Sequence, residues 1–232
     1  MSTLPNNAKA VIALTSWKAR INTVGQTIFS LLIQCPNYHI VLTLSSDEFP
    51  HKLSELPNDL IQLCNKGLIE ILWVSTNYRS FKKILFAMDK YKDVPIISAD
   101  DDCLYYCNYA EKMYNIWKQH PDCVVTLGKG ANGNAELGME PWPTGSKSLY
   151  PPYCFKDVWK PLLPKIYTQT NDDDTFYSFM INHIFHLKIL SPFTDAERNV
   201  YVFHDSINAL SSNKSKYGYH QAMKVIVNAI KG

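Results

Sequence analysis

Three consecutive carboxylates, Asp100, Asp101 and Asp102, follow a short apolar segment at residues 94–97 that is predicted to be a buried strand. Three adjacent anions repel one another, so they need a positive partner wherever they leave water. In an extended chain the side chains of Asp100 and Asp102 point to the same side. Both could therefore bind one hard divalent cation, which would in turn hold the phosphates of a nucleotide. The alternative interpretation is a solvated acidic turn.

A second polar group follows the predicted strand at residues 10–14. Thr15 and Ser16 offer hydroxyl groups, Trp17 offers an aromatic ring and Arg20 offers a cation. Such side chains suit a nucleotide base, a ribose or a phosphate. The alternative is that the hydroxyl groups cap a turn and the ring packs on the surface.

Lys82 and Lys83 lie where a helix, residues 81–91, is predicted to begin after the strand at residues 68–74. Cations at a helix start oppose the helix macrodipole, so these lysines are not placed there for helix stability. Their position makes a phosphate or carboxylate partner more plausible than it usually is for surface lysines, and solvated surface charge stays an equal alternative.

Asp172, Asp173 and Asp174 precede an apolar helical run at residues 176–187. Asn171 as the N-cap, with acidic residues in the first turn, would be ordinary helix chemistry. Three acids exceed what capping requires, however, and a carboxylate held in a site could act as a general base.

His204 ends a late predicted strand at residues 200–203, and a histidine beside a carboxylate cluster can complete the ligand set of a cation. Residues 128–133 match the pattern GxGxxG, but no amphipathic helix follows, so we exclude a dinucleotide-binding fingerprint. The six cysteines include no CxxC pair, which indicates reduced thiols.

The composition limits the class of protein. With 23 basic and 21 acidic residues the formal charge is only +2, which gives no electrostatic case for a nucleic-acid partner. The N-terminal residues do not resemble a signal peptide, and no apolar stretch approaches the roughly 18 residues that span a bilayer. We therefore expect a cytoplasmic protein without a transmembrane segment, with at most weak peripheral contact at the inner face of the membrane.

Strands and helices alternate in the first half of the chain. The predicted strands are residues 10–14, 39–44, 68–74, 94–97 and 123–127. The predicted helices are 23–34, 81–91 and 106–120, with a helical region at 52–65 that a proline interrupts. This rhythm predicts an α/β fold whose central sheet is mostly parallel and flanked by helices. Ligands in such folds bind beyond the carboxyl ends of the strands, where the Asp triplet would lie. The second half loses the rhythm: a long loop at 128–146 is followed by predicted helices at 157–163, 173–187 and 219–230.

Six blocks in this order resemble the GT-A class of glycosyltransferases, particularly bacterial surface-polysaccharide enzymes related to glycosyltransferase family 2. The blocks are residues 12–21, 27–34, 78–83, 98–102, 149–152 and 173–174, and they span about residues 8–190. The resemblance implies a single GT-A (Rossmann-like) domain over residues 1–232. Its nucleotide-sugar-binding half would be 1–127 and its acceptor-binding half 128–232.

The resemblance also implies a chemistry. A nucleotide-sugar donor, UDP-linked, would be bridged through Mn²⁺ or Mg²⁺ to Asp100 and Asp102, and the acceptor would be a saccharide or a lipid-linked molecule. The acidic pair Asp173 and Asp174 would supply the catalytic base of an inverting enzyme, with Asp174 matching the second acid of the family's pair. The donor-binding residues would be Thr15, Ser16, Arg20, Lys82, Lys83, Asp100 and Asp101.

Two rival classes stay open at this point. A nucleotidyltransferase that makes an activated sugar would need a glycine-rich phosphate loop early in the chain, and residues 10–25 contain only Gly25. A non-catalytic module that binds nucleotide sugars would share the fold without the reaction.

Overall fold

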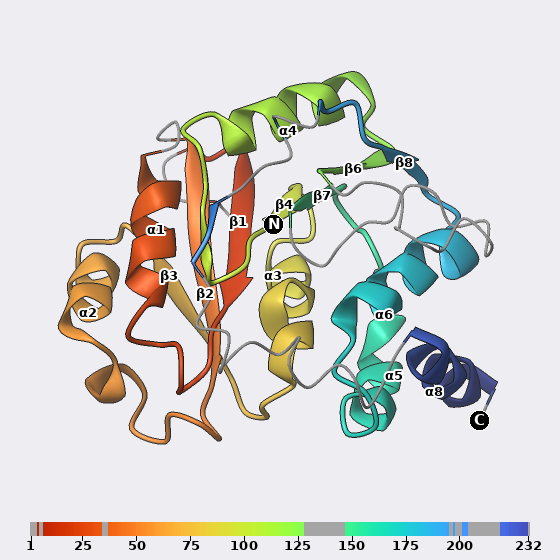
Figure 1. The fold of residues 1–232 in the computed structure, drawn as a ribbon, viewed down its shortest axis with the longest axis horizontal. Helices are drawn as coiled ribbons and strands as arrows, with labels where there is room; N and C mark the ends of the chain where they lie inside the picture. The colour runs from red at the N-terminus through yellow and green to blue at the C-terminus, as the bar shows by residue number, and fades with distance from the viewer. Residues whose placement is uncertain are drawn as a thin grey trace.

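A mixed sheet of seven strands forms the centre of the molecule (Figure 1). The computed structural model describes residues 4, 7–33, 37–127, 147–194, 197, 201–203 and 219–231. The strand order is β3-β2-β1-β4-β7-β6-β8. The bounds are β1 Ala10–Thr15, β2 Tyr38–Ser45, β3 Glu70–Val74, β4 Ile96–Ser98, β6 Cys123–Thr126, β7 Ser148–Tyr150 and β8 Lys188–Leu190.

Four neighbouring strands, β3, β2, β1 and β4, run parallel. β1 is apolar along its first five residues and is buried over its whole length, as expected for a strand covered on both faces. Alternate residues of β1 enter two different apolar clusters: Ile12 and Leu14 face one, whereas Val11 and Ala13 face the other. The predicted α/β fold with a mostly parallel sheet is therefore confirmed.

Helices cover the two faces of the sheet (Figure 1). α1 (Val24–Leu32), α2 (Asn58–Asn65) and α4 (Tyr109–Gln119) contribute side chains to the cluster of Ile12 and Leu14. α3 (Leu85–Lys90), α5 (Trp159–Ile166), α6 (Asp173–Phe179) and α8 (Tyr219–Lys231) contribute to the cluster of Val11 and Ala13. In the described part of the chain no helix is both long enough and apolar enough to cross a membrane.

Three short strands were not predicted, because two or three residues carry no readable periodicity. β7 pairs antiparallel with both β4 and β6, so it interrupts the parallel order with a segment from the second half of the chain. β8 extends the same sheet, and β5 (Cys103–Leu104) pairs antiparallel with β9 (Tyr201–Val202). The two predicted halves thus share one sheet.

Two predicted helices differ from those observed. The segment predicted as one helix over residues 81–91 begins as the 3₁₀ turn η3 (Arg79–Lys83), and α3 follows. The segment predicted over 173–187 is α6 followed by the π-helical turn η5 (Met180–Ile184), and its last residues lead into β8. The helix predicted over 52–65 is interrupted at Pro57, as its proline indicated, into the 3₁₀ turn η2 (Lys52–Glu55) and α2.

A polar cluster around Glu70 lies at the amino-terminal edge of the parallel strands. Glu70 at the start of β3 accepts hydrogen bonds from Tyr91 (2.5 Å) and Lys90 (2.8 Å) and lies 3.1 Å from His39 Nε2. Burial alone would raise the pKa of Glu70, but the hydrogen bonds from His39, Lys90 and Tyr91 outweigh it and lower the pKa to about 2. The cluster therefore stabilises the fold only while this carboxylate is charged.

Lowering the pH should decrease the free energy of unfolding through protonation of Glu70. Its folded-state pKa is depressed below the reference value of 4.5, so the stabilisation is complete above that pH and is lost as the pH falls towards 2. Between about pH 6 and pH 3 we expect this group to contribute a loss of about 2 kcal/mol in the free energy of unfolding. Urea unfolding at both pH values, compared with Glu70→Gln, measures it. A wild-type pH dependence equal to that of the variant would contradict the assignment.

Candidate active site

A cavity of about 550 Å³ opens beyond the carboxyl ends of β1, β2, β3 and β4. Ligands of open α/β sheets bind at this edge because loops from several strands converge there. The cavity is lined by Thr15, Ser16, Trp17, Arg20, Glu48, Asn77, Arg79, Ser80, Lys82, Lys83, Asp100, Asp101, Asp102, Cys103, Lys147, Asn171, Asp173, Asp174 and Val202.

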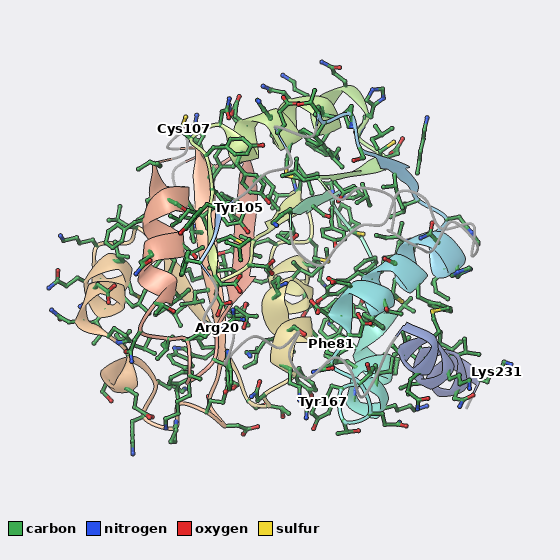
Figure 2. All side chains as sticks on the ribbon, viewed as in Figure 1. Arg20, Phe81, Tyr105, Cys107, Tyr167 and Lys231 are labelled. Atoms are coloured by element: carbon green, nitrogen blue, oxygen red, sulfur yellow. The ribbon has the colours of Figure 1, made fainter. Side chains whose placement is uncertain are left out.

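The loop after β1 holds the middle of the Asp triplet. Ser16 Oγ donates a hydrogen bond of 2.6 Å to Asp101 Oδ2, and Arg20 lies 3.0 Å from Asp101 Oδ1. Burial raises the pKa of Asp101 to about 6, against the opposing effects of Arg20 and Ser16. Figure 2 shows Arg20 near the ends of the central strands. Asp101 therefore fastens this loop to the turn after β4.

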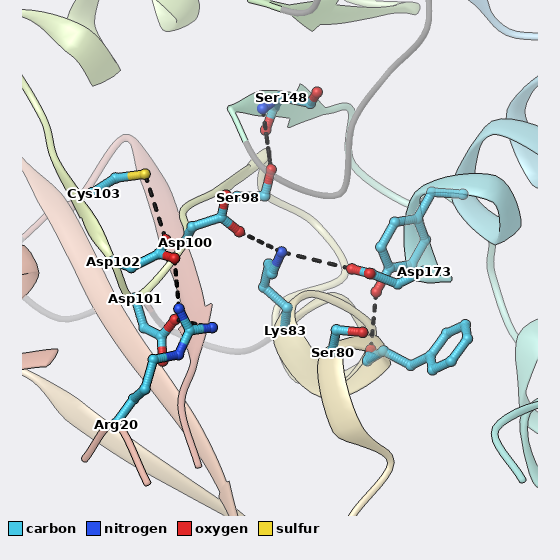
Figure 3. Close-up of polar contacts among 12 residues, drawn as sticks. Arg20, Ser80, Lys83, Ser98, Asp100, Asp101, Asp102, Cys103, Ser148 and Asp173 are labelled. Carbon is cyan, nitrogen blue, oxygen red and sulfur yellow. Dashed lines mark hydrogen bonds and ion pairs between the residues drawn. The ribbon is translucent and has the colours of Figure 1, made fainter. Parts of the chain in front are cut away.

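The outer two aspartates have different cationic partners (Figure 3). Asp102 Oδ2 lies 2.5 Å from Arg20 Nη1, whereas Asp100 Oδ1 accepts a hydrogen bond of 2.7 Å from Lys83 Nζ. The backbone that carries them is fixed by tyrosines: the Tyr105 hydroxyl accepts from the Asp100 amide, and the Tyr109 hydroxyl donates to the Ser98 carbonyl. The triplet is thus a positioned and neutralised group, unlike a solvated acidic turn.

Lys83 lies between the two acidic clusters of the chain (Figure 3). Its Nζ is 2.7 Å from Asp100 Oδ1 and 3.6 Å from Asp173 Oδ2. Burial alone would lower the pKa of Lys83, but Asp100, Asp173 and Asp174 outweigh it and raise that pKa above its usual range. A permanently charged ammonium group therefore joins segments that are distant in sequence.

Lys82 is more enclosed and less strongly paired. Its side chain is 1% exposed, and its Nζ donates to Asn77 Oδ1 (3.1 Å) and to the Arg79 carbonyl (3.2 Å). Burial lowers the pKa of Lys82 to about 8, against the opposing charges of Glu48 and Asp101. Arg79, whose carbonyl accepts the hydrogen bond from Lys82, has a φ of 53°. This left-handed backbone conformation costs a non-glycine residue free energy.

In the second acidic cluster, Asp172–Asp174, one residue caps a helix and two line the cavity. Asp172, and not Asn171, is the N-cap of α6, since its carboxylate accepts hydrogen bonds from the amide and the hydroxyl of Thr175. Asp173 and Asp174 occupy the first turn and line the cavity. Asp172 therefore caps the amino terminus of the helix, and the carboxylates of Asp173 and Asp174 are the two that can take part in the site.

The donor atoms around the triplet fit a hard divalent cation. One oxygen each of Asp100 and Asp102 and the sulfur of Cys103 lie within 4.8 Å of one another. Burial raises the pKa of the Cys103 thiol to about 12. Hard divalent cations prefer oxygen ligands to sulfur, so the two carboxylates are the donors that suit such an ion. Two carboxylates, completed by phosphate and water oxygens, match what Mg²⁺ or Mn²⁺ takes from proteins.

The structure brings together nearly every residue singled out from the sequence. Trp17 lines this cavity, and so do ten residues predicted to bind the donor or the ion or to act as the base: Thr15, Ser16, Arg20, Lys82, Lys83, Asp100, Asp101, Asp102, Asp173 and Asp174. Thr15 is the least available, because its hydroxyl donates to the Thr43 carbonyl at 2.7 Å. His204 and the loop at 128–146 lie outside the described residues.

Sequence reasoning missed several lining residues. Glu48 and Asn77 follow β2 and β3, so the convergence of parallel strand ends could have identified them. Lys147 had no such signal, since its place depends on the unpredicted strand β7. Its amide donates to the Ser98 carbonyl at 3.1 Å.

Solved structures share the architecture of this chain. Residues 1–349 of TarS from S. aureus superpose with a TM-score of 0.55 at 14% identity, covering 96% of this chain and 65% of TarS 1-349. The same protein in complex with UDP-GlcNAc gives a TM-score of 0.54 at 12% identity. The mannosyltransferase PcManGT from Pyrobaculum calidifontis, in complex with GDP-Man and Mn²⁺, gives 0.54 at 9% identity over 81% of this chain and 55% of that one. The chain has the fold of these proteins.

The likeness concerns the fold, because the identities are low. This chain spans less than two thirds of the length of either protein. No protein-family model matches the sequence, and no curated protein sequence matches it either.

Proposed function

We propose that the chain is a glycosyltransferase that moves a sugar from a nucleotide sugar, UDP-linked, to a hydroxyl of a saccharide or lipid-linked acceptor, with inversion. The observation that carries the proposal is the meeting of two acidic clusters, Asp100–Asp102 and Asp173–Asp174, in one cavity at the carboxyl edge of the sheet. Proteins with this fold have been solved with UDP, UDP-GlcNAc and GDP-Man. In this proposal the first cluster serves the departing diphosphate, and the second serves the acceptor hydroxyl.

The first loop and the basic residues would bind the donor. Trp17 and Arg20 each have a side-chain N–H group, Nε1 and Nε respectively, that is buried without a hydrogen-bond partner among the described residues. Buried donors normally have partners, so these two groups suit the oxygens of a nucleotide. Lys82 and Lys83, which line the same cavity, would contact the diphosphate in this proposal.

Asp100 and Asp102 would hold Mn²⁺ or Mg²⁺ in this proposal. When bound, the ion supplies positive charge that stabilises the diphosphate as a leaving group. Arg20 and Lys83 pair with these carboxylates, so they hold the two side chains in place before the donor arrives.

The second cluster would supply the base. A carboxylate takes the proton of the acceptor hydroxyl, whose oxygen forms a bond to the anomeric carbon. The bond from that carbon to the phosphate oxygen breaks, and its electron pair leaves with UDP. Asp174 suits this step better than Asp173, because Asp173 is 5% exposed and lies next to Lys83, whereas Asp174 is half-buried at the cavity wall.

The proposal predicts a metal-dependent release of UDP. Incubation with UDP-glucose, UDP-galactose and UDP-GlcNAc in the presence of Mn²⁺ should release UDP from at least one donor, and chelation should abolish the release. Each donor is measured with and without oligosaccharide acceptors, and GDP-mannose serves as the donor of a different nucleotide.

The rival classes give different outcomes in the same assay. Pyrophosphate-dependent formation of UTP from a UDP-sugar would indicate a nucleotidyltransferase. Tight binding of UDP-sugars without turnover under any condition would indicate a non-catalytic module. Either result contradicts the proposal.

A further inference from the structure

We propose that Asn171 binds a hydroxyl group of the sugar that is transferred, and so takes part in choosing the donor. This inference rests on the proposed function and names a residue for its sugar-binding part. Asn171 is 7% exposed and lines the cavity, and its side-chain Oδ1 is buried without a hydrogen-bond partner among the described residues. Buried amide oxygens are rarely left unbonded, because burial without a partner costs free energy.

The backbone holds Asn171 in place from two sides. Its carbonyl oxygen accepts a hydrogen bond of 3.2 Å from Ser80 Oγ and another of 3.2 Å from the Asp173 amide. Ser80 belongs to η3, which also carries Lys83, and Asp173 opens α6. Figure 3 shows Ser80 and Lys83 on one segment facing Asp173. These two bonds fix the main chain of Asn171 and leave its side-chain Oδ1 without a partner among the described residues.

The chemistry of the orphan atom identifies the kind of partner. A carboxamide oxygen accepts hydrogen bonds, so it needs a donor. Phosphate oxygens in a diphosphate ester are ionised at neutral pH and carry no proton to donate. A sugar hydroxyl does donate, and it also accepts from an amide N–H. Near the proposed reaction centre the diphosphate cannot donate and a hydroxyl of the transferred sugar can, so we assign that hydroxyl to Asn171.

The position of Asn171 favours the donor sugar over the acceptor. In the proposed reaction the anomeric carbon lies between the diphosphate, at Asp100 and Asp102, and the base, at Asp174. Lys83 connects these two sides through contacts of 2.7 Å and 3.6 Å, so the transferred sugar must lie close to it. Asn171 is 7% exposed and lies next to this place, because its carbonyl is bonded by Ser80, which shares η3 with Lys83, and by the amide of Asp173, whose carboxylate is 3.6 Å from Lys83.

Titration calorimetry with UDP and with UDP-sugars tests the proposal. For Asn171→Ala we expect the affinity for UDP to stay within about twofold of wild type and the affinity for the best-bound UDP-sugar to fall about tenfold, as one buried hydrogen bond requires. Monodeoxy analogues of that UDP-sugar locate the partner: one analogue should bind wild type and variant equally. Asn171→Ser, which keeps a small polar group, gives the same separation if the alanine variant does not fold.

Asn182→Ala is the matched control. Asn182 also has a half-buried carboxamide, which donates to the Ser178 carbonyl in the same helical segment, and it does not line the cavity. This variant should bind UDP and UDP-sugars as wild type does.

Two outcomes overturn the inference, and they differ from each other. If wild type turns over UDP-sugars and the Asn171 variants lose UDP and UDP-sugar affinity equally, or lose neither, Asn171 has no sugar partner and the proposed function stands. If wild type binds no UDP-sugar, the proposed function fails and the inference fails with it.

Discussion

Replacing Asp174 by asparagine is expected to lower kcat by about 10²–10⁴-fold, the usual contribution of a general base. The affinity for the donor should change by less than about twofold, because in the proposed arrangement Asp174 serves the acceptor hydroxyl and holds neither the ion nor the diphosphate. The amide keeps the shape of the carboxylate but cannot accept the proton of the acceptor hydroxyl. Steady-state kinetics with saturating donor and acceptor, together with donor titration, measure both quantities.

Asp173→Asn should give a different pattern. Asp173 Oδ2 lies 3.6 Å from Lys83 Nζ, and Lys83 also contacts Asp100 at 2.7 Å. Loss of the Asp173 charge therefore leaves Lys83 with Asp100 as its close carboxylate and shifts it towards the donor side. We expect donor affinity and kcat to change together in this variant, whereas Asp174→Asn changes kcat alone.

Asp172→Ala is the matched control for the cluster. Asp172 caps α6 through Thr175 and does not line the cavity, so its loss should cost about 1 kcal/mol of stability and leave kcat unchanged. If all three substitutions lowered the melting temperature and kept a normal kcat, the cluster would be a helix cap without a part in catalysis.

The order of elements was predictable because long elements carry readable periodicity. The strand predicted at residues 10–14 and the helix predicted at 23–34 are observed as β1 and α1. β7 was not predictable, because three residues, Ser148–Tyr150, have no period and their place depends on pairing with β4 and β6. Tertiary context likewise decided the 3₁₀ and π-helical turns that flank α3 and α6.

The site was predictable at the level of residue types and strand ends, but not at the level of pairing. Ser16, Arg20 and Asp100 all follow predicted strands, and ligands of such folds bind beyond the carboxyl ends of the strands. The structure has these three residues in one cavity. The rule about strand ends did not indicate that Arg20 would hold Asp101 and Asp102, or that Lys83 would reach Asp173. Such contacts depend on how loops from distant segments pack, which no local pattern encodes.

Replacing Asp102 by asparagine should remove the metal dependence of nucleotide binding. In wild type, Mn²⁺ should raise the affinity for UDP. In the variant this gain should fall by at least roughly 10–100-fold, because losing a group that only supports a metal ligand already costs that much. The fold should survive, because Arg20 keeps its contact of 3.0 Å with Asp101 when Asp102 becomes neutral. Calorimetric titration of UDP with and without Mn²⁺ measures the gain directly.

Asp100→Asn should lower the affinity for UDP in the presence of Mn²⁺ by less than Asp102→Asn does. The substitution weakens the contact of 2.7 Å between Asp100 and Lys83, so the ammonium group becomes available to the diphosphate and replaces part of the lost metal attraction. The exposed Asp122 serves as the control for a lost surface charge, and Asp122→Asn should retain the full gain from Mn²⁺. If Asp102→Asn and Asp122→Asn show the same gain as wild type, Asp102 does not hold the ion, and the Asp triplet serves only to bind Arg20 and Lys83.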